Sequence, residues 1–129
     1  MAWDLDTDRP IYSQLVERLQ MQIVSGQYPP GGKLPSVRDL AAVAAVNPNT
    51  MQKAFTELER SGLIVTQRTN GRNVIEDVQR IQGIRANLAK EQVETFFTRM
   101  KELGYAEAET LELLNGKHCI SNNYEGEQG

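Results

Sequence analysis

The sequence predicts a mainly α-helical fold that contains one small β-hairpin, and three observations lead to it. Apolar residues recur every four positions over residues 10–25, which is the spacing of one face of an amphipathic helix. Two short helices are expected within residues 34–61, because a good helix-capping residue precedes each of them. Residues 69–71 form an Asn-Gly type of turn between two short β-prone stretches. A further helical region follows from position 78.

The first helix is expected over residues 10–25. Its apolar face consists of four residues one turn apart: Ile11, Leu15, Leu19 and Ile23. Gly26 is the type of residue that ends a helix, because glycine adopts the left-handed conformation without strain. Residues 1–9 hold Trp3 and Leu5 between acids, so they form either a short arm packed on a neighbour or a frayed terminus. Residues 28–32 are a turn-rich linker that cannot continue the helix.

Two short helices joined by a tight turn form the central part of the chain. Ser36 caps the first of them, and Asp39 stands three residues later, as in a capping box. Ala45 lies in the turn. Asn47 caps the second helix and Pro48 takes its first position, where the missing N–H costs nothing.

The second of these helices begins with short hydrogen-bonding side chains. They are Asn49, Thr50, Gln52 and Lys53. The apolar residues that alternate with them at helical spacing are expected in the core: Met51, Ala54, Phe55 and Leu58. Such a polar helix start suits the edge of a base pair. The layout is that of a helix-turn-helix, whose second helix enters the major groove with its N-terminus first.

A hairpin is expected after Gly62 ends the second helix. Residues 63–67 are apolar and β-branched, residues 69–71 supply the turn, and residues 73–75 form the return strand. Three helices followed by a hairpin make a winged helix-turn-helix. Arg68 and Arg72 flank the tip of this wing, where an arginine can enter a narrow minor groove.

Three stretches of this chain together resemble the DNA-binding domain of the GntR family of transcription regulators. They read PIYSQLVERLQMQIVSGQYPPGGKLPS, LPSVRDLA and VNPNTMQKAFTELERSGLI, and the resemblance spans residues 10–77. The VNPNT segment and the short tail are similar to the YtrA-like branch of the family. Two differences are visible. Ala45 stands where that turn often has glycine, and Gly71 is alone in a wing where many members have two glycines, which leaves the geometry of the wing tip open.

The resemblance implies a dimeric, sequence-specific, DNA-binding transcription regulator, with repressor as the favoured role. If the dimer has two-fold symmetry, its operator is expected to be an inverted repeat. Residues 1–77 would form the DNA-binding domain. Phosphate or base contacts are expected from the caps, the second helix and the wing: Ser36, Arg38, Asn47, Asn49, Thr50, Gln52, Lys53, Arg68, Asn70, Gly71 and Arg72. Asn49 and Thr50 are stronger candidates than Asn47, because one cap per helix suffices. The alternative for each is a solvated helix face or an ordinary turn residue.

The tail is expected to be a helical dimerisation segment over residues 78–116, followed by a flexible stretch over residues 117–129. Its apolar residues form an imperfect stripe: Ile84, Leu88, Phe96, Phe97, Met100 and Leu103. This stripe packs either on its own winged domain or on a second chain. Two short helices offer little within one chain to cover it, so a homodimer is favoured.

Charge is distributed unevenly along the chain. The whole protein has a net charge of −3, but residues 33–75 hold six basic and three acidic residues, a local excess of three positive charges. The predicted helix-turn-helix therefore carries the positive field that phosphate contacts require. No run approaches the length of a membrane span and no signal peptide opens the sequence.

Other classes of function have little support in the residues. The single cysteine excludes an internal disulfide and fits a cytoplasmic location. His118 and Cys119 stand alone, without the three or four ligands that a metal needs, and neither a catalytic set nor a cofactor motif is present. A winged-helix protein-interaction module without DNA binding remains the alternative, and an enzyme fragment is the third possibility. An effector, if there is one, would bind at the dimer interface, because about fifty residues after the wing are too few for a roomy pocket.

Overall fold

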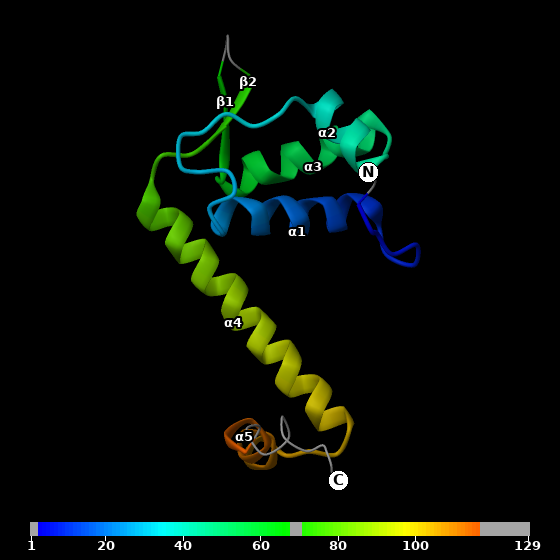
Figure 1. Cartoon of the computed structure of the whole chain (residues 1–129), viewed down its shortest axis with the longest axis vertical. Helices are drawn as coiled ribbons and strands as arrows, with labels where there is room; N and C mark the ends of the chain where they lie inside the picture. Colours follow the sequence, from blue (N-terminus) through cyan, green and yellow to red (C-terminus); the bar gives the residue numbers. More distant parts are fainter. Residues whose placement is uncertain (1–2, 68–70, 117–129) are drawn as a thin grey trace. The chain divides into compact units, whose positions relative to one another are not determined.

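The computed structural model describes residues 3–67 and 71–116 of the chain, and it divides into two compact units, Met1–Ala86 and Asn87–Gly129. The described elements are α1 (Ile11–Val24), α2 (Val37–Ala44), α3 (Pro48–Ser61), β1 (Ile64–Gln67), β2 (Gly71–Val74), α4 (Val78–Glu102) and α5 (Glu107–Asn115). Figure 1 shows them in chain order. These described elements are mainly helices with a two-stranded antiparallel sheet, so the predicted fold class, mainly α with a small β-hairpin, is confirmed. The predicted tail of residues 117–129 lies outside the described residues.

The first unit is built around α3. Its inward residues Met51, Phe55 and Leu58 are almost fully buried. They pack against Leu15, Leu19 and Ile23 of α1, whose four-residue spacing predicted this face. α1 runs alongside α3, as Figure 1 shows, and the shorter α2 packs against the end where α3 begins. The opposite face of α3 is thereby left to polar residues and solvent.

The hairpin continues the core beyond the end of α3. Gly62 ends α3 in the left-handed conformation, with φ of 86°, and redirects the chain into β1. Ile64 pairs with Val74 in the antiparallel register, and both side chains are buried against the helices. Gly71, the first residue of β2, has φ of 77°, as a tight turn needs.

The linker that was predicted as a turn also pairs with the hairpin. The Leu34 N–H donates to the Arg72 carbonyl at 2.9 Å, and the Val74 N–H donates to the Gly32 carbonyl at 2.9 Å. Lys33 and Asn73 form an isolated antiparallel bridge. The linker therefore covers the outer edge of β2 and ties the hairpin to the start of α2. Its residues lack the β-branched pattern that predicts a strand.

The residues before α1 form an arm that is attached to α1. The buried side chain of Gln14 accepts the Asp6 N–H at 2.7 Å and donates to the Asp6 carbonyl at 2.8 Å. The Arg9 guanidinium bonds both oxygens of Glu17, and this hydrogen bonding raises the pKa of Arg9. Trp3 and Leu5 lie against the edge of the core. Of the two sequence interpretations, the packed arm describes residues 3–9.

α4 begins in the first unit, where Ile81 is buried in the core and Ile84 packs at its edge. The second unit holds the rest of α4 and α5. Gly104, with φ of 98°, follows the end of α4, and Glu109 accepts the Ala106 N–H at 2.8 Å at the start of α5. None of the described helices is long and apolar enough to cross a membrane.

Candidate DNA-binding surface

The start of α3 is held in place by its cap. The Asn47 side chain accepts the Asn49 N–H at 2.7 Å, and Pro48 occupies the first turn. Asn47 is thus engaged as the helix cap, which the sequence predicted. Asn49, Gln52 and Lys53 are exposed on this end of the helix, and Thr50 is half-buried. The short polar side chains therefore lie together at the open N-terminal end of α3.

α2 presents a second set of polar groups. Ser36 accepts the Asp39 N–H at 3.0 Å, which is the half of the predicted capping box that the structure contains. Arg38, at the second position of α2, is exposed. Within the described residues it takes part in no ion pair, so its guanidinium is available for an anionic ligand.

The turn between α2 and α3 depends on Ala45. This residue has φ of 61°, a left-handed conformation that costs a residue with a Cβ atom about 1–2 kcal/mol. The Val46 N–H donates to the Ala41 carbonyl at 3.0 Å and closes the turn. The turn of the helix-turn-helix therefore forms without glycine, at a local cost in strain.

Lys53 has a neighbour that sequence reasoning missed. Its Nζ lies 4.9 Å from the centroid of the Tyr12 ring on α1. A cation over an aromatic face is attracted to it, which restricts where the ammonium group lies. Tyr12 is next to Ile11 of the apolar stripe, and only the packing of α1 on α3 brings it to Lys53.

Of the described wing residues, Arg72 has neighbours that the sequence did not indicate. Arg72 does not extend freely: its Cζ lies 5.2 Å from the Phe55 ring centroid and its Nε lies 3.9 Å from Glu59 Oε1. Gly71 is exposed, and an added Cβ would meet nothing within 4 Å. Arg68 and Asn70 lie outside the described residues. The structure thus packs α2 against α3, the two helices that hold most of the predicted residues, and turns Arg72 toward α3.

The two acidic residues of α3, Glu57 and Glu59, each lie near a basic residue. Glu57 lies 3.5 Å from Arg60, and Glu59 is close to Arg72. Arg38 on α2 and Lys53 on α3 are exposed and outside these ion pairs, so they supply positive charge on the two helices of the motif. This combination of an exposed polar helix start and flanking cations fits a phosphate backbone and the base edges between its strands.

A helix-turn-helix followed by a two-stranded wing defines the class of winged-helix DNA-binding proteins. The family model of the GntR bacterial regulatory proteins matches residues 11–74. The chain belongs to the GntR family, as the sequence predicted, and it is a DNA-binding transcription regulator.

Similar proteins support this assignment. An uncharacterized HTH-type transcriptional regulator of Bacillus subtilis, YhcF, is 38% identical over 106 residues, which cover 82% of this chain and 88% of YhcF. The HTH-type transcriptional repressor YtrA of the same species is 42% identical over 76 residues, 59% of this chain and 58% of YtrA. A GntR family transcriptional regulator from Listeria monocytogenes has a solved structure with a TM-score of 0.79, 38% identity, and coverage of 86% of this chain and 97% of that chain. The relatives are regulators, which agrees with the prediction of a non-enzymatic protein.

Proposed function

We propose that this protein is a dimeric repressor that binds an inverted-repeat operator, and that it does so in the cytoplasm, the compartment that holds the DNA of a bacterium. The observation that supports this most strongly is the exposed polar N-terminal end of α3, together with the exposed side chains of Arg38 on α2 and Lys53 on α3. Asn49, Thr50 and Gln52 would read base edges in the major groove, and Lys53 would hold phosphate. The repressor assignment takes its support from YtrA, which is named as a repressor.

The dimer is proposed from the second unit. Of its described residues, 87–116, only Thr110 is buried. Large apolar side chains are exposed along both of its helices and in the connection between them: Val93, Phe96, Leu103, Tyr105, Leu111, Leu113 and Leu114. Two helices with so little buried surface do not stabilise each other alone, and exposed apolar patches of this kind mark an association surface.

The six predicted dimerisation residues have different surroundings. Phe96 and Phe97 contact each other edge to face, with ring centroids 5.6 Å apart, and Leu103 is 73% exposed. Leu88 and Met100 are half-buried. Ile84 packs at the edge of the first unit's core, so we assign the proposed interface mainly to the residues from Leu88 onward.

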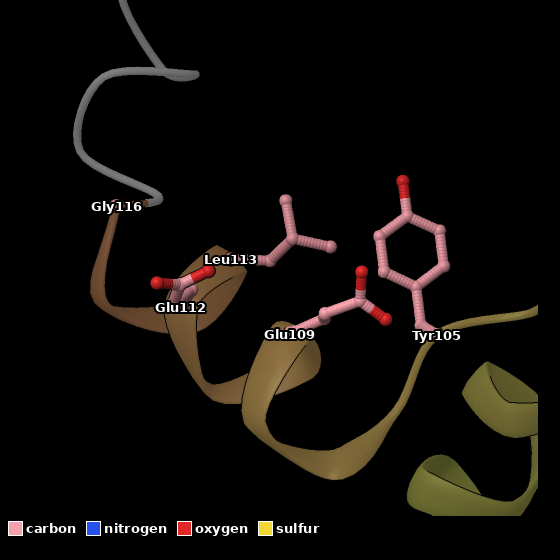
Figure 2. A pocket seen from close by; sticks show the side chains of 5 residues that line it. All are labelled: Tyr105, Glu109, Glu112, Leu113 and Gly116. Atoms are coloured by element: carbon pink, nitrogen blue, oxygen red, sulfur yellow. The ribbon is translucent and has the colours of Figure 1, made fainter.

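An effector site is proposed at the interface between two copies. The second unit has a hollow of about 280 Å³ lined by Tyr105, Glu109, Glu112, Leu113 and Gly116. Figure 2 shows the Tyr105 ring beside the Leu113 side chain, with the Glu109 carboxylate next to it. This volume is just below the range of ordinary small-molecule sites, about 300–1,000 Å³. A second copy beside these residues would add the walls that one chain lacks.

The dimer is tested by sedimentation of the full chain at micromolar concentration. We expect a dimer, and we expect Phe96→Glu to shift it toward monomer. Thr98→Glu is the matched control, because it adds the same charge two residues along α4, on the opposite face of the helix. A monomeric wild-type chain would contradict the proposed dimer, as would equal effects of the two substitutions.

The operator is tested by a footprint on the DNA upstream of the protein's own gene. A symmetric dimer predicts two protected half-sites whose centres lie about 10 base pairs apart, or a multiple of that. Protection of one asymmetric half-site would argue against the inverted repeat. Failure of an intact dimer to bind this DNA would favour the alternative, a winged-helix module that binds proteins.

A further inference from the structure

Three polar or charged side chains and one aromatic ring connect the hairpin to α3. Phe55 and Glu59 come from α3, Thr66 from β1 and Arg72 from β2, and we call these four residues the wing latch. Thr66 pairs directly with Arg72 in the hairpin register, two positions from the buried pair of Ile64 and Val74. Because strand side chains alternate, Thr66 and Arg72 lie on the same face of the hairpin as the buried pair, which is the face toward α3.

Glu59 contacts both strands through its carboxylate. The Thr66 hydroxyl donates to Glu59 Oε2, and Arg72 Nε lies 3.9 Å from Glu59 Oε1. The Glu59 and Arg72 side chains are 34% and 23% exposed. Arg72 also covers the ring of Phe55, which is itself buried in the core. The Glu59 carboxylate of α3 thus accepts a hydrogen bond from Thr66 of β1 and lies at ion-pair distance from Arg72 of β2, whose Nε has no hydrogen-bond partner among the described residues.

We propose that the wing latch sets the position of the wing relative to α3, so that the wing and the recognition helix reach neighbouring parts of the DNA together. In this assignment Glu59 and Arg72 are positioning residues, and Arg72 does not contact DNA. The inference rests on the proposed use of α3 in the major groove. It follows from the inner-face register of Arg72, whose transfer to a phosphate would give up both the Phe55 ring and Glu59.

If Arg72 instead contacted DNA, the expected change in DNA affinity on substitution of Glu59 would have the opposite sign. If Arg72 bound phosphate, Glu59 would be a competing anion, and Glu59→Gln would tighten DNA binding. If Arg72 belongs to the latch, Glu59→Gln removes the charge that orients it and weakens binding. The substitution is suitable because glutamine keeps an oxygen that can accept from Thr66.

The test measures the affinity of the full chain for a duplex carrying its footprinted operator, over a series of salt concentrations. We expect Glu59→Gln and Arg72→Gln each to weaken binding by roughly three- to tenfold, and the double variant to be no weaker than the worse single variant, because the two residues act as one unit. The slope of log affinity against log salt should stay at the wild-type value, since no phosphate contact is lost. Hydroxyl-radical protection should decrease at the wing-contacted flank and persist at the centre of the half-site.

Two further variants keep the outcome clear. Arg72→Lys preserves the charge but not the planar guanidinium, so the latch predicts weakened binding, whereas a phosphate contact predicts near wild-type affinity. Arg60→Gln is the matched control, because Arg60 is an exposed arginine on α3 that pairs with Glu57, outside the latch. Thermal melting of every variant separates a shifted wing from a general loss of stability.

The proposal is overturned if Glu59→Gln tightens binding, if Arg72→Gln lowers the salt slope by about one, or if the two losses add. A loss of protection across the whole half-site would also overturn it, because that marks general destabilisation. Absence of specific binding by the wild-type chain would remove the proposed function as well. If the wild-type chain binds its operator specifically but any of the other results above is found, the wing latch is refuted and the proposed function stands.

Discussion

Replacement of Arg38 by alanine should weaken operator binding without affecting the fold. Arg38 is exposed at the second position of α2 and has no ion-pair partner within the described part of the chain. A surface substitution of this kind changes the free energy of unfolding by less than about 0.5 kcal/mol. Any larger change in DNA affinity is therefore the loss of a contact with DNA.

The size of that loss depends on what Arg38 touches. An arginine that forks onto guanine contributes about 1–3 kcal/mol, which corresponds to roughly 5- to 150-fold weaker binding of Arg38→Ala to the operator and much less on scrambled DNA. Lys53→Ala should instead weaken both duplexes by similar factors and lower the salt slope by about one.

The assay is fluorescence anisotropy on operator and scrambled duplexes at several salt concentrations, with Arg60→Ala as the control. Arg60 loses the same charge at the other end of α3, where its side chain is 75% exposed. If Arg38→Ala loses affinity equally on both duplexes, Arg38 is a phosphate clamp. Specificity would then rest on Asn49, Thr50 and Gln52.

Two further predictions concern stability, measured by thermal melting at fixed protein concentration. Asn47→Ala should lower the free energy of unfolding by about 1 kcal/mol, because it removes the 2.7 Å hydrogen bond from the Asn49 N–H to the Asn47 side chain. Asn47→Ser should keep most of this stability, because serine is also a good helix cap. Equal losses for the two variants would show that the cap contributes little. Gly32→Ala should destabilise the chain by about 1–3 kcal/mol, because the new Cβ would lie 2.9 Å from the Pro29 carbonyl oxygen. Gly83→Ala should stabilise α4 by about 0.5–1 kcal/mol, because its new Cβ would meet nothing within 4 Å. The reverse order of stabilities would contradict this account of the two glycines.

Much of the first unit could be predicted because its local signals agree. The four-residue stripe of α1, the caps at Ser36 and Asn47, and the stop at Gly62 each specify one boundary and one buried face. The apolar residues of α3 then determine which of its polar residues are exposed. The prediction that Asn49, Gln52 and Lys53 are available to DNA follows directly from this division of α3 into a buried apolar face and an exposed polar face.

The interpretation of Arg72 shows where sequence reasoning stopped. Because Arg72 directly follows the turn residues 69–71, the sequence suggested a side chain that is free at the wing tip. Its orientation depends on the pairing register, which places it on the same face as Val74. The neighbours Phe55 and Glu59 come from a different element, and no local pattern indicates that they lie beside Arg72. The cation–aromatic contact between Lys53 and Tyr12 was missed for the same reason.

The central claim is that the start of α3 recognises the operator sequence. The most direct test compares DNA specificity before and after Asn49 and Gln52, its exposed candidates for base contacts, are replaced. The ratio of operator to scrambled affinity should be at least about 10³ for the wild-type chain at physiological salt. In the double variant Asn49→Ala/Gln52→Ala, we expect this ratio to fall by more than about tenfold, with scrambled binding little changed. A double variant that keeps the wild-type ratio would contradict the claim that the start of α3 reads the operator.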